Sequence, residues 1–206
     1  MFVAYAIMFC LAFTVAVLSA PLVRALAIRV GAVDRPDGKR KIHTKAMPRL
    51  GGLIITVSII AAAVAYFLIN RSVTNLIFTT PAKIAGFLAG FAIILGLGIF
   101  DDISPVRPRV KLLWQTLAVV VCFSVGLRVQ VPLVTQPHLA FALSFVATWF
   151  WLVACINSMN LVDGIDGLAS GVAFFAGAVI FVVAAVHMKI AVALTAAAVL
   201  GSVVGF

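Results

Sequence analysis

Seven stretches of this chain contain no charged side chain, and each has about the length of a membrane-spanning helix. A helix that crosses a bilayer needs roughly 17 to 25 predominantly apolar residues. The fourth stretch is slightly short by this measure unless its flanks contribute. The stretches are residues 2–23, 50–69, 84–100, 112–127, 139–156, 168–186 and 190–206. The pattern predicts an all-α polytopic membrane protein with about seven transmembrane helices.

Composition agrees with this prediction. The chain is 65% hydrophobic and only 10% charged. This is too small a share of charged residues to cover the surface of a soluble domain. A net charge of +9 would suit nucleic acid, but no soluble domain is predicted that could present a basic groove. We therefore expect no nucleic-acid partner. Basic loops here contact anionic membrane lipid or bind an anionic substrate.

The loops between the predicted helices differ in charge. One set carries eleven Lys and Arg and the other carries four, and the richer set is expected to be cytoplasmic, with the N-terminus outside. All six acidic residues are aspartates, and all fall in cytoplasmic segments, 24–49, 101–111 and 157–167. Carboxylates beside a bilayer are functional candidates by default. We expect one site, facing the cytoplasm from the plasma (inner) membrane.

The first cytoplasmic loop is dense in cations and ends in two glycines. It delivers five cations and one histidine after a turn sequence at 36–38. Such density suits a phosphate-rich ligand, and His43, Lys45 and Arg49 are the candidate substrate-binding residues. Gly51 and Gly52 follow, where either a close backbone approach or tight helix packing would favour them.

Two adjacent aspartates, Asp101 and Asp102, end the third predicted helix. Like charges so close repel each other, and a cation beside them relieves the repulsion. Mg²⁺ suits such a pair, because it takes one or two protein carboxylates and completes its shell with water and substrate phosphate. A purely structural pair is the weaker alternative, since aspartate at a helix C-terminus opposes the macrodipole. Asp101 and Asp102 are therefore candidate metal ligands and catalytic groups.

The fifth helix leads into the most specific pattern of the chain, four polar residues spaced three apart: Asn157, Asn160, Asp163 and Asp166. This spacing places them near one another along one side of a helix or tight helical turn. Asn157 and Asn160 can read a base or sugar, Asn160 can also ligate a metal, and the aspartates can bind metal, orient a donor or take a proton. We assign Asp163 and Asp166 as catalytic, with Asp166 also binding substrate. The alternative is that they only cap helices.

In this order the motifs resemble the polyprenyl-phosphate N-acetylhexosamine-1-phosphate transferases, of the glycosyltransferase family 4 type. The motifs are Pro48-Arg49-Leu50-Gly51-Gly52, Phe100-Asp101-Asp102, Lys111-Leu-Leu-Trp-Gln115, and Asn157-x-x-Asn160-x-x-Asp163-Gly-x-Asp166-Gly-Leu-Ala. The resemblance covers the whole chain. Arg49 and Leu50 resemble the branch that acts on undecaprenyl phosphate with N-acetylglucosamine. The alternative branch, the phospho-N-acetylmuramoyl-pentapeptide transferases, has Thr-Met there.

The resemblance implies that a UDP-N-acetylhexosamine and undecaprenyl phosphate meet at the cytoplasmic face. Mg²⁺, or Mn²⁺ in its place, assists, UMP leaves, and a lipid diphosphate sugar for cell-envelope polysaccharide remains. It places Asp101 and Asp102 near the lipid phosphate and metal, Lys111 on a phosphate, and Asn160 with the two later aspartates on the nucleotide and metal side. It is compatible with a homodimer. We favour direct attack by the lipid phosphate over a covalent aspartyl intermediate, since a phosphate monoester is already mostly dianionic at neutral pH.

The last apolar stretch has 17 residues and reaches only ~25 Å, short of the ~30 Å hydrocarbon core. The family's Phe-Met-Gly-Asp segment and His-rich loop are also absent. We therefore expect residues 1–206 to be one transmembrane catalytic domain cut at its C-terminus, and inactive or severely impaired alone.

Two other classes use carboxylates in membranes. The CDP-alcohol phosphatidyltransferases share Asp-x-x-Asp-Gly, but this chain has Ser170 where their motif has Ala and lacks the rest of the motif. A transporter would line a path with carboxylates at mid-membrane depth, whereas these aspartates are expected at one face.

Overall fold

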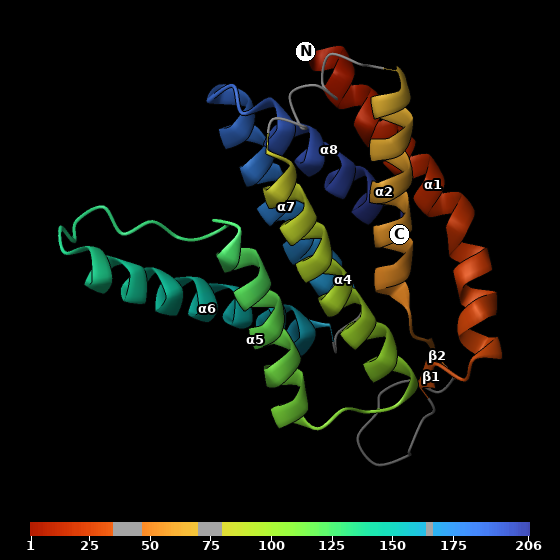
Figure 1. Ribbon diagram of the computed structural model, residues 1–206. Helices are drawn as coiled ribbons and strands as arrows, with labels where there is room; N and C mark the ends of the chain where they lie inside the picture. Colours follow the sequence, from red (N-terminus) through yellow and green to blue (C-terminus); the bar gives the residue numbers. More distant parts are fainter. Residues whose placement is uncertain (35–46, 70–79, 164–166) are drawn as a thin grey trace. The chain divides into compact units, whose positions relative to one another are not determined.

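The computed structural model describes residues 1–34, 47–69, 80–163 and 167–206 (Figure 1). Over these ranges the chain forms seven α-helices and one short pair of strands. The helices are α1 (Phe2–Arg29), α2 (Gly51–Ile69), α4 (Pro81–Ile103), α5 (Pro108–Ser124), α6 (Pro137–Val162), α7 (Leu168–Val186) and α8 (Ile190–Gly205), and the strands are β1 (Val33–Asp34) and β2 (Met47–Pro48).

Proline and glycine set the helix boundaries. The helices α4, α5 and α6 each begin at a proline, whose missing N–H is not needed in the first turn. The helix α1 ends at Arg29, and Gly31 follows its cap with a φ of 77° while Ala32 N–H donates to the Ala27 carbonyl (2.9 Å), as in a Schellman cap. The helices α1, α4 and α6 extend beyond their charge-free stretches, and α5 begins four residues before its stretch. One consequence corrects the predicted loop 101–111: Lys111 lies on α5 and not in a loop.

Among the described helices, five are long and apolar enough to cross a membrane: α1, α2, α4, α6 and α7. The chain is thus an all-α polytopic membrane protein, as predicted. The predicted number of about seven spans is higher, because α5 carries Arg109 and Lys111 within its 17 residues and α8 has only 16 residues. The direction of the chain across the membrane stays a prediction.

The chain divides into two compact units, described here separately. Unit 1 comprises residues 1–76, 101–105 and 167–206. Its most buried helix is α8, which packs against α1, α2 and α7. The approach of α8 to α1 is very close, since a Cβ on Gly201 would lie 2.1 Å from the Phe9 carbonyl oxygen. Small residues that let backbones approach are typical of helix packing in membranes.

Unit 2 comprises residues 77–100 and 106–166, and so contains α4 up to Phe100, together with α5 and α6. A Cβ on Gly86 would lie 2.3 Å from Val125, and one on Gly90 would lie 2.5 Å from the Cys122 sulfur. These glycines therefore form the face by which α4 packs on the end of α5. The helices α5 and α6 are joined by a hydrogen bond from Trp149 Nε1 to Thr116 Oγ1 (2.9 Å).

The strand pair β1–β2 was not predicted, because two residues on each side are too few to show an alternating pattern. It is antiparallel and pairs Val33 with Pro48. Next to it, Arg49 N–H donates to the Ala32 carbonyl (2.8 Å). This pairing ties the segment that enters α2 to the end of α1.

Candidate active site

One half of the predicted site lies in unit 1, where the segment before α2 meets the end of α4. The backbone N–H of Leu50 donates to Asp102 Oδ2 (3.1 Å). Leu50 is 3% exposed and has a φ of 71°. Such a conformation costs a non-glycine residue about 1–3 kcal/mol and persists where the surroundings enforce it. The carboxylate bond and the neighbouring Arg49 bond supply that enforcement.

This contact joins two motifs that are 52 residues apart in sequence. Asp101 and Asp102 occupy the last turn of α4 and are both half-buried. Arg49 directly precedes Leu50 and is also half-buried. Carboxylates at the negative end of a helix dipole are held at an energetic cost. The arrangement favours a cation or a cationic complex as their partner.

The other half of the predicted site lies in unit 2 and rests on a pair of amides. Asn157 Nδ2 donates to Gln115 Oε1 (2.8 Å) and to the Val153 carbonyl (2.8 Å). Gln115 Nε2 donates in return to Asn157 Oδ1 (3.4 Å). Because both amide hydrogens of Asn157 are used, its oxygen alone retains capacity for a ligand. Asn157 can thus accept a hydrogen bond or contact a cation.

Gln115 is a site residue to which the sequence analysis assigned no role. It is only 3% exposed, although glutamine is a polar residue type that is mostly found at the surface. Its place in the motif that begins at Lys111 was the available signal. Lys111 stands one turn earlier on α5 and is half-buried, so the two side chains share one helix face.

Asn160 and Asp163 continue along α6 beyond Asn157. Asn160 lies in the last turn, and Asp163 is the C-terminal cap, with its N–H donating to the Met159 carbonyl (3.0 Å). Both residues remain largely exposed. Even so, partial burial of its carboxyl raises the pKa of Asp163 above the ordinary value. Protonation is therefore easier at Asp163 than at a fully solvated aspartate.

Three predicted site residues, His43, Lys45 and Asp166, lie outside the described residues. The remaining ones divide between the units, with Arg49, Asp101 and Asp102 in unit 1 and Lys111, Asn157, Asn160 and Asp163 in unit 2. Within each unit the structure brings predicted residues together. In unit 1 the segment that contains Arg49 lies next to Asp102. In unit 2 the face of α5 that carries Lys111 and Gln115 is joined to α6 at Asn157.

The donor atoms fit a hard divalent cation. In unit 1, Asp101 and Asp102 offer carboxylate oxygens, the protein ligands that Mg²⁺ usually takes. In unit 2, Asn160 offers an amide oxygen, which is also a hard donor atom. Among the described residues, no three His, Cys, Asp or Glu side chains gather into one cluster. A protein site with few carboxylates is normal for Mg²⁺, which retains water and substrate phosphate in its shell.

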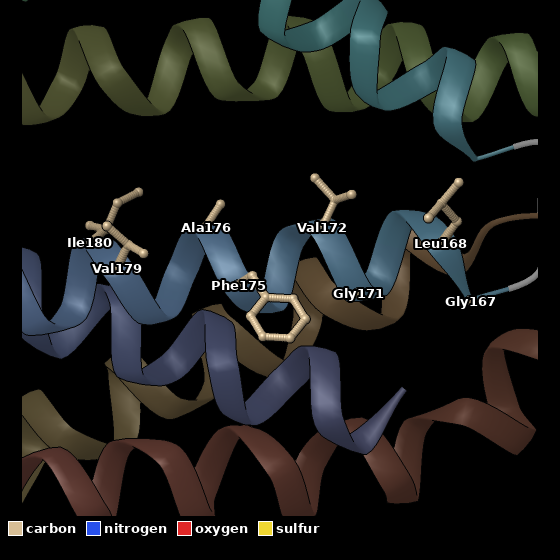
Figure 2. Close-up of a pocket in the computed structure, with 8 residues that line it drawn as sticks. All are labelled: Gly167, Leu168, Gly171, Val172, Phe175, Ala176, Val179 and Ile180. Carbon is tan, nitrogen blue, oxygen red and sulfur yellow. The ribbon is translucent and has the colours of Figure 1, made fainter.

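An apolar groove runs along one face of α7 from its first turn (Figure 2). It has a volume of about 730 Å³ and is lined by glycine, alanine and large apolar side chains. Gly167 stands at its start, one residue after the Asn-Asp motif ends. The lining residues are Gly167, Leu168, Gly171, Val172, Phe175, Ala176, Val179 and Ile180. Such a surface can accommodate a hydrocarbon chain.

Replacing Asp163 with asparagine is expected to remove a pH dependence of stability. The folded-state pKa of Asp163 lies above the ordinary value of 3.8, so between these two values the folded chain binds more protons than the unfolded chain. Stability therefore falls as pH rises through this window, and the cost persists at neutral pH. The variant should lose this slope and be at least as stable as the parent at neutral pH. Thermal unfolding across the window measures both; lower stability of the variant at neutral pH would contradict the expectation.

Comparison with known proteins defines the class. Residues 84–206 match the family model of glycosyl transferase family 4. The chain belongs to this family of membrane enzymes. Membership decides against the transporter and CDP-alcohol phosphatidyltransferase interpretations.

Named relatives lie within two branches of the family. A Bacillus subtilis (strain 168) protein named as a probable undecaprenyl-phosphate N-acetylglucosaminyl 1-phosphate transferase is 33% identical over 90% of this chain and 50% of its own length. A decaprenyl-phosphate N-acetylglucosaminephosphotransferase of Mycobacterium tuberculosis (strain H37Rv) is 34% identical over 72% of this chain and 37% of its own. A phospho-N-acetylmuramoyl-pentapeptide-transferase of Desulforamulus reducens is 30% identical over 90% and 58%. The chain thus spans between 37% and 58% of the length of these relatives.

Proposed function

We propose that the protein transfers N-acetylglucosamine 1-phosphate from UDP-N-acetylglucosamine to undecaprenyl phosphate, releasing UMP. The observation that carries this proposal is the bond between Leu50 N–H and Asp102. It connects the Pro48-Arg49-Leu50 sequence, which resembles the N-acetylglucosamine branch, to the aspartate pair. The relatives named for N-acetylglucosamine phosphate transfer support the same branch.

The aspartate pair would serve the acceptor. Asp101 and Asp102 would hold Mg²⁺, which when bound neutralises phosphate charge. Arg49 would add positive charge where the lipid phosphate binds, and Lys111 would contact a phosphate through its ammonium group. Because the acceptor phosphate is mostly dianionic at neutral pH, alignment and charge neutralisation are the main requirements for its reaction.

The α6 end would serve the nucleotide sugar. Asn157, held by Gln115, would offer its oxygen to the donor, and Asn160 and Asp163 would line the same helix face. In the direct reaction an oxygen of the lipid phosphate attacks the phosphorus that bears the sugar. A new P–O bond forms, the bond from that phosphorus to the bridging oxygen breaks, and UMP leaves with the bonding electrons. The apolar groove on α7 supports a hydrocarbon-bearing acceptor.

The test is an assay of the full-length protein in detergent or vesicles, with undecaprenyl phosphate and a divalent cation. UMP release and lipid-linked sugar are measured with UDP-N-acetylglucosamine and, in parallel, with UDP-N-acetylmuramoyl-pentapeptide. We expect product with the first donor, loss of product on chelation, and recovery with Mg²⁺ or Mn²⁺. Product with the pentapeptide donor alone would place the protein in the other branch. UMP release that continues under full chelation would overturn the metal assignment.

A further inference from the structure

Unit 2 holds an exposed arginine, Arg128, far from Asp163, the acidic residue of this unit that the structure describes. The guanidinium carbon of Arg128 lies 5.5 Å from the ring centre of Phe123 and 5.6 Å from that of Phe141. The Phe123 side chain is buried at the end of α5, while Phe141 lies in the first part of α6. The two rings meet edge to face at 5.1 Å. Arg128 is therefore held by cation–π contacts from two helices.

The backbone beside Arg128 is fixed as well. Val129 N–H donates to Thr148 Oγ1 (2.9 Å), and the Val129 carbonyl accepts a hydrogen bond from Ser144 Oγ. Both hydroxyls are buried on α6, at 3% and 5% exposure. These are two of the few buried polar side chains of unit 2, and both serve this connection between α5 and α6. The Arg128 position is thus built into the fold rather than left to a loose loop.

No carboxylate of the described part of unit 2 can pair with Arg128. Asp163, its one described acidic residue, caps the far end of α6. From Phe141 to Asp163 the helix rises by roughly 33 Å. Lys83 is much nearer than Asp163: its side-chain Cε lies 3.8 Å from where a Cβ on Gly126 would stand, two residues before Arg128.

The same connection exposes apolar side chains. Leu133 is 93% exposed and Val129 is 41% exposed. The helix α6 that follows is long and apolar enough to span a membrane, so the connection at its start belongs at a membrane–water boundary. There the apolar side chains can enter the lipid while cations meet headgroup phosphates. An arginine fork matches a phosphate better than a point charge does.

We propose that Arg128, assisted by Lys83, binds the phosphate of an anionic phospholipid headgroup at the membrane–water interface. This site is separate from the proposed transferase chemistry, which resides at the other end of α6 in this unit. It is a lipid-binding site that biases which lipids surround the protein. Its test does not require activity.

The experiment reconstitutes the full chain in phosphatidylcholine vesicles that contain a minority of phosphatidylglycerol. Spin-labelled phosphatidylglycerol and spin-labelled phosphatidylcholine report, by electron paramagnetic resonance, the relative association constant of each lipid with the protein. The parent should prefer phosphatidylglycerol. Arg128→Gln should lower that preference about five-fold, and adding Lys83→Gln should lower it further. The matched control is Lys189→Gln, which removes an exposed cation from the α7–α8 turn in unit 1.

Two further variants separate positioning from charge. Phe141→Leu keeps the arginine but removes one ring that holds it, so a partial loss of preference is expected. Arg128→Lys keeps the charge without the fork, should retain part of the preference, and remains informative if the glutamine variant does not fold. An unchanged preference in the folded Arg128→Gln variant would overturn the proposal. An equal loss of the phosphatidylglycerol preference in Lys189→Gln would overturn the proposal too. Displacement of both labelled lipids by excess inorganic phosphate would also overturn it, because it would indicate a site for free phosphate.

Discussion

Replacing Asp102 with asparagine in the full-length protein is expected to lower sugar-phosphate transfer by about 10²–10³-fold while leaving the fold intact. Asparagine still offers an oxygen to the Leu50 N–H, so the 3.1 Å bond can persist. It removes only the negative charge, which the proposal uses to hold Mg²⁺. UMP release measures the activity, and thermal unfolding measures the fold.

Asp102→Ala is the matched comparison. It removes both the charge and the acceptor, and so leaves the buried Leu50 N–H without its partner. We expect the same loss of activity together with a loss of about 1–3 kcal/mol in stability. The pair of variants separates the two roles of one side chain. If Asp102→Asn keeps a tenth or more of the parental rate, the charge is not essential and the metal assignment fails.

Breaking the amide pair of unit 2 is the second change with a large expected effect. Gln115→Leu removes both of its hydrogen bonds with Asn157 at a position only 3% exposed. We expect a loss of about 1–3 kcal/mol in stability. Transfer should fall by at least about ten-fold, because Asn157 is no longer held in position for the donor. Steady-state kinetics and thermal unfolding of the full-length protein measure the two effects.

A double-mutant cycle with Asn157→Leu tests whether the two residues act together. Residues in direct contact couple by about 0.5–3 kcal/mol, so the double variant should be less destabilised than the sum of the single ones. Thr116→Val supplies the control, since it removes another α5–α6 hydrogen bond, from Trp149, outside the candidate site. It should lower stability with little effect on transfer. Additive effects at Gln115 and Asn157, or an equal loss of transfer in Thr116→Val, would contradict the role given to the amide pair.

The helices were predictable from hydrophobic stretches, and their ends were not. A charge-free stretch shows which residues lipid or the protein core can cover, but it does not show where the helix ends. Arginine and lysine are good helix formers, so Arg29 and Lys111 lie within helices although they are charged. Pro108 and Gly31 decide the boundaries instead. Proline has no N–H for a helix interior, and glycine readily adopts the left-handed conformation that ends a helix. Accordingly, α5 begins four residues before the predicted stretch at 112–127, and its 17 residues include Arg109 and Lys111, so that it is no clear span.

The chemical groups of the candidate site were also evident in the sequence. Charged and amide side chains are rare in so apolar a chain, so Asp101, Asp102, Asn157, Asn160 and Asp163 stood out without any coordinates. Their partners did not stand out. Leu50 contributes only its backbone N–H, which no side-chain pattern reveals, and Gln115 differs from a lipid-facing or helix-capping glutamine only by its burial against α6.

By itself, then, the sequence determined that the protein is an α-helical membrane protein, and it singled out the side chains that are candidates for its chemistry. Both follow from the high cost of placing charge in a hydrocarbon environment. Only the tertiary structure decided that Asp102 accepts from Leu50, that Gln115 holds Asn157, and that Arg128 contacts both Phe123 and Phe141. Each of these contacts joins segments brought together by helix packing, and packing depends on shape and on close backbone approach rather than on local composition.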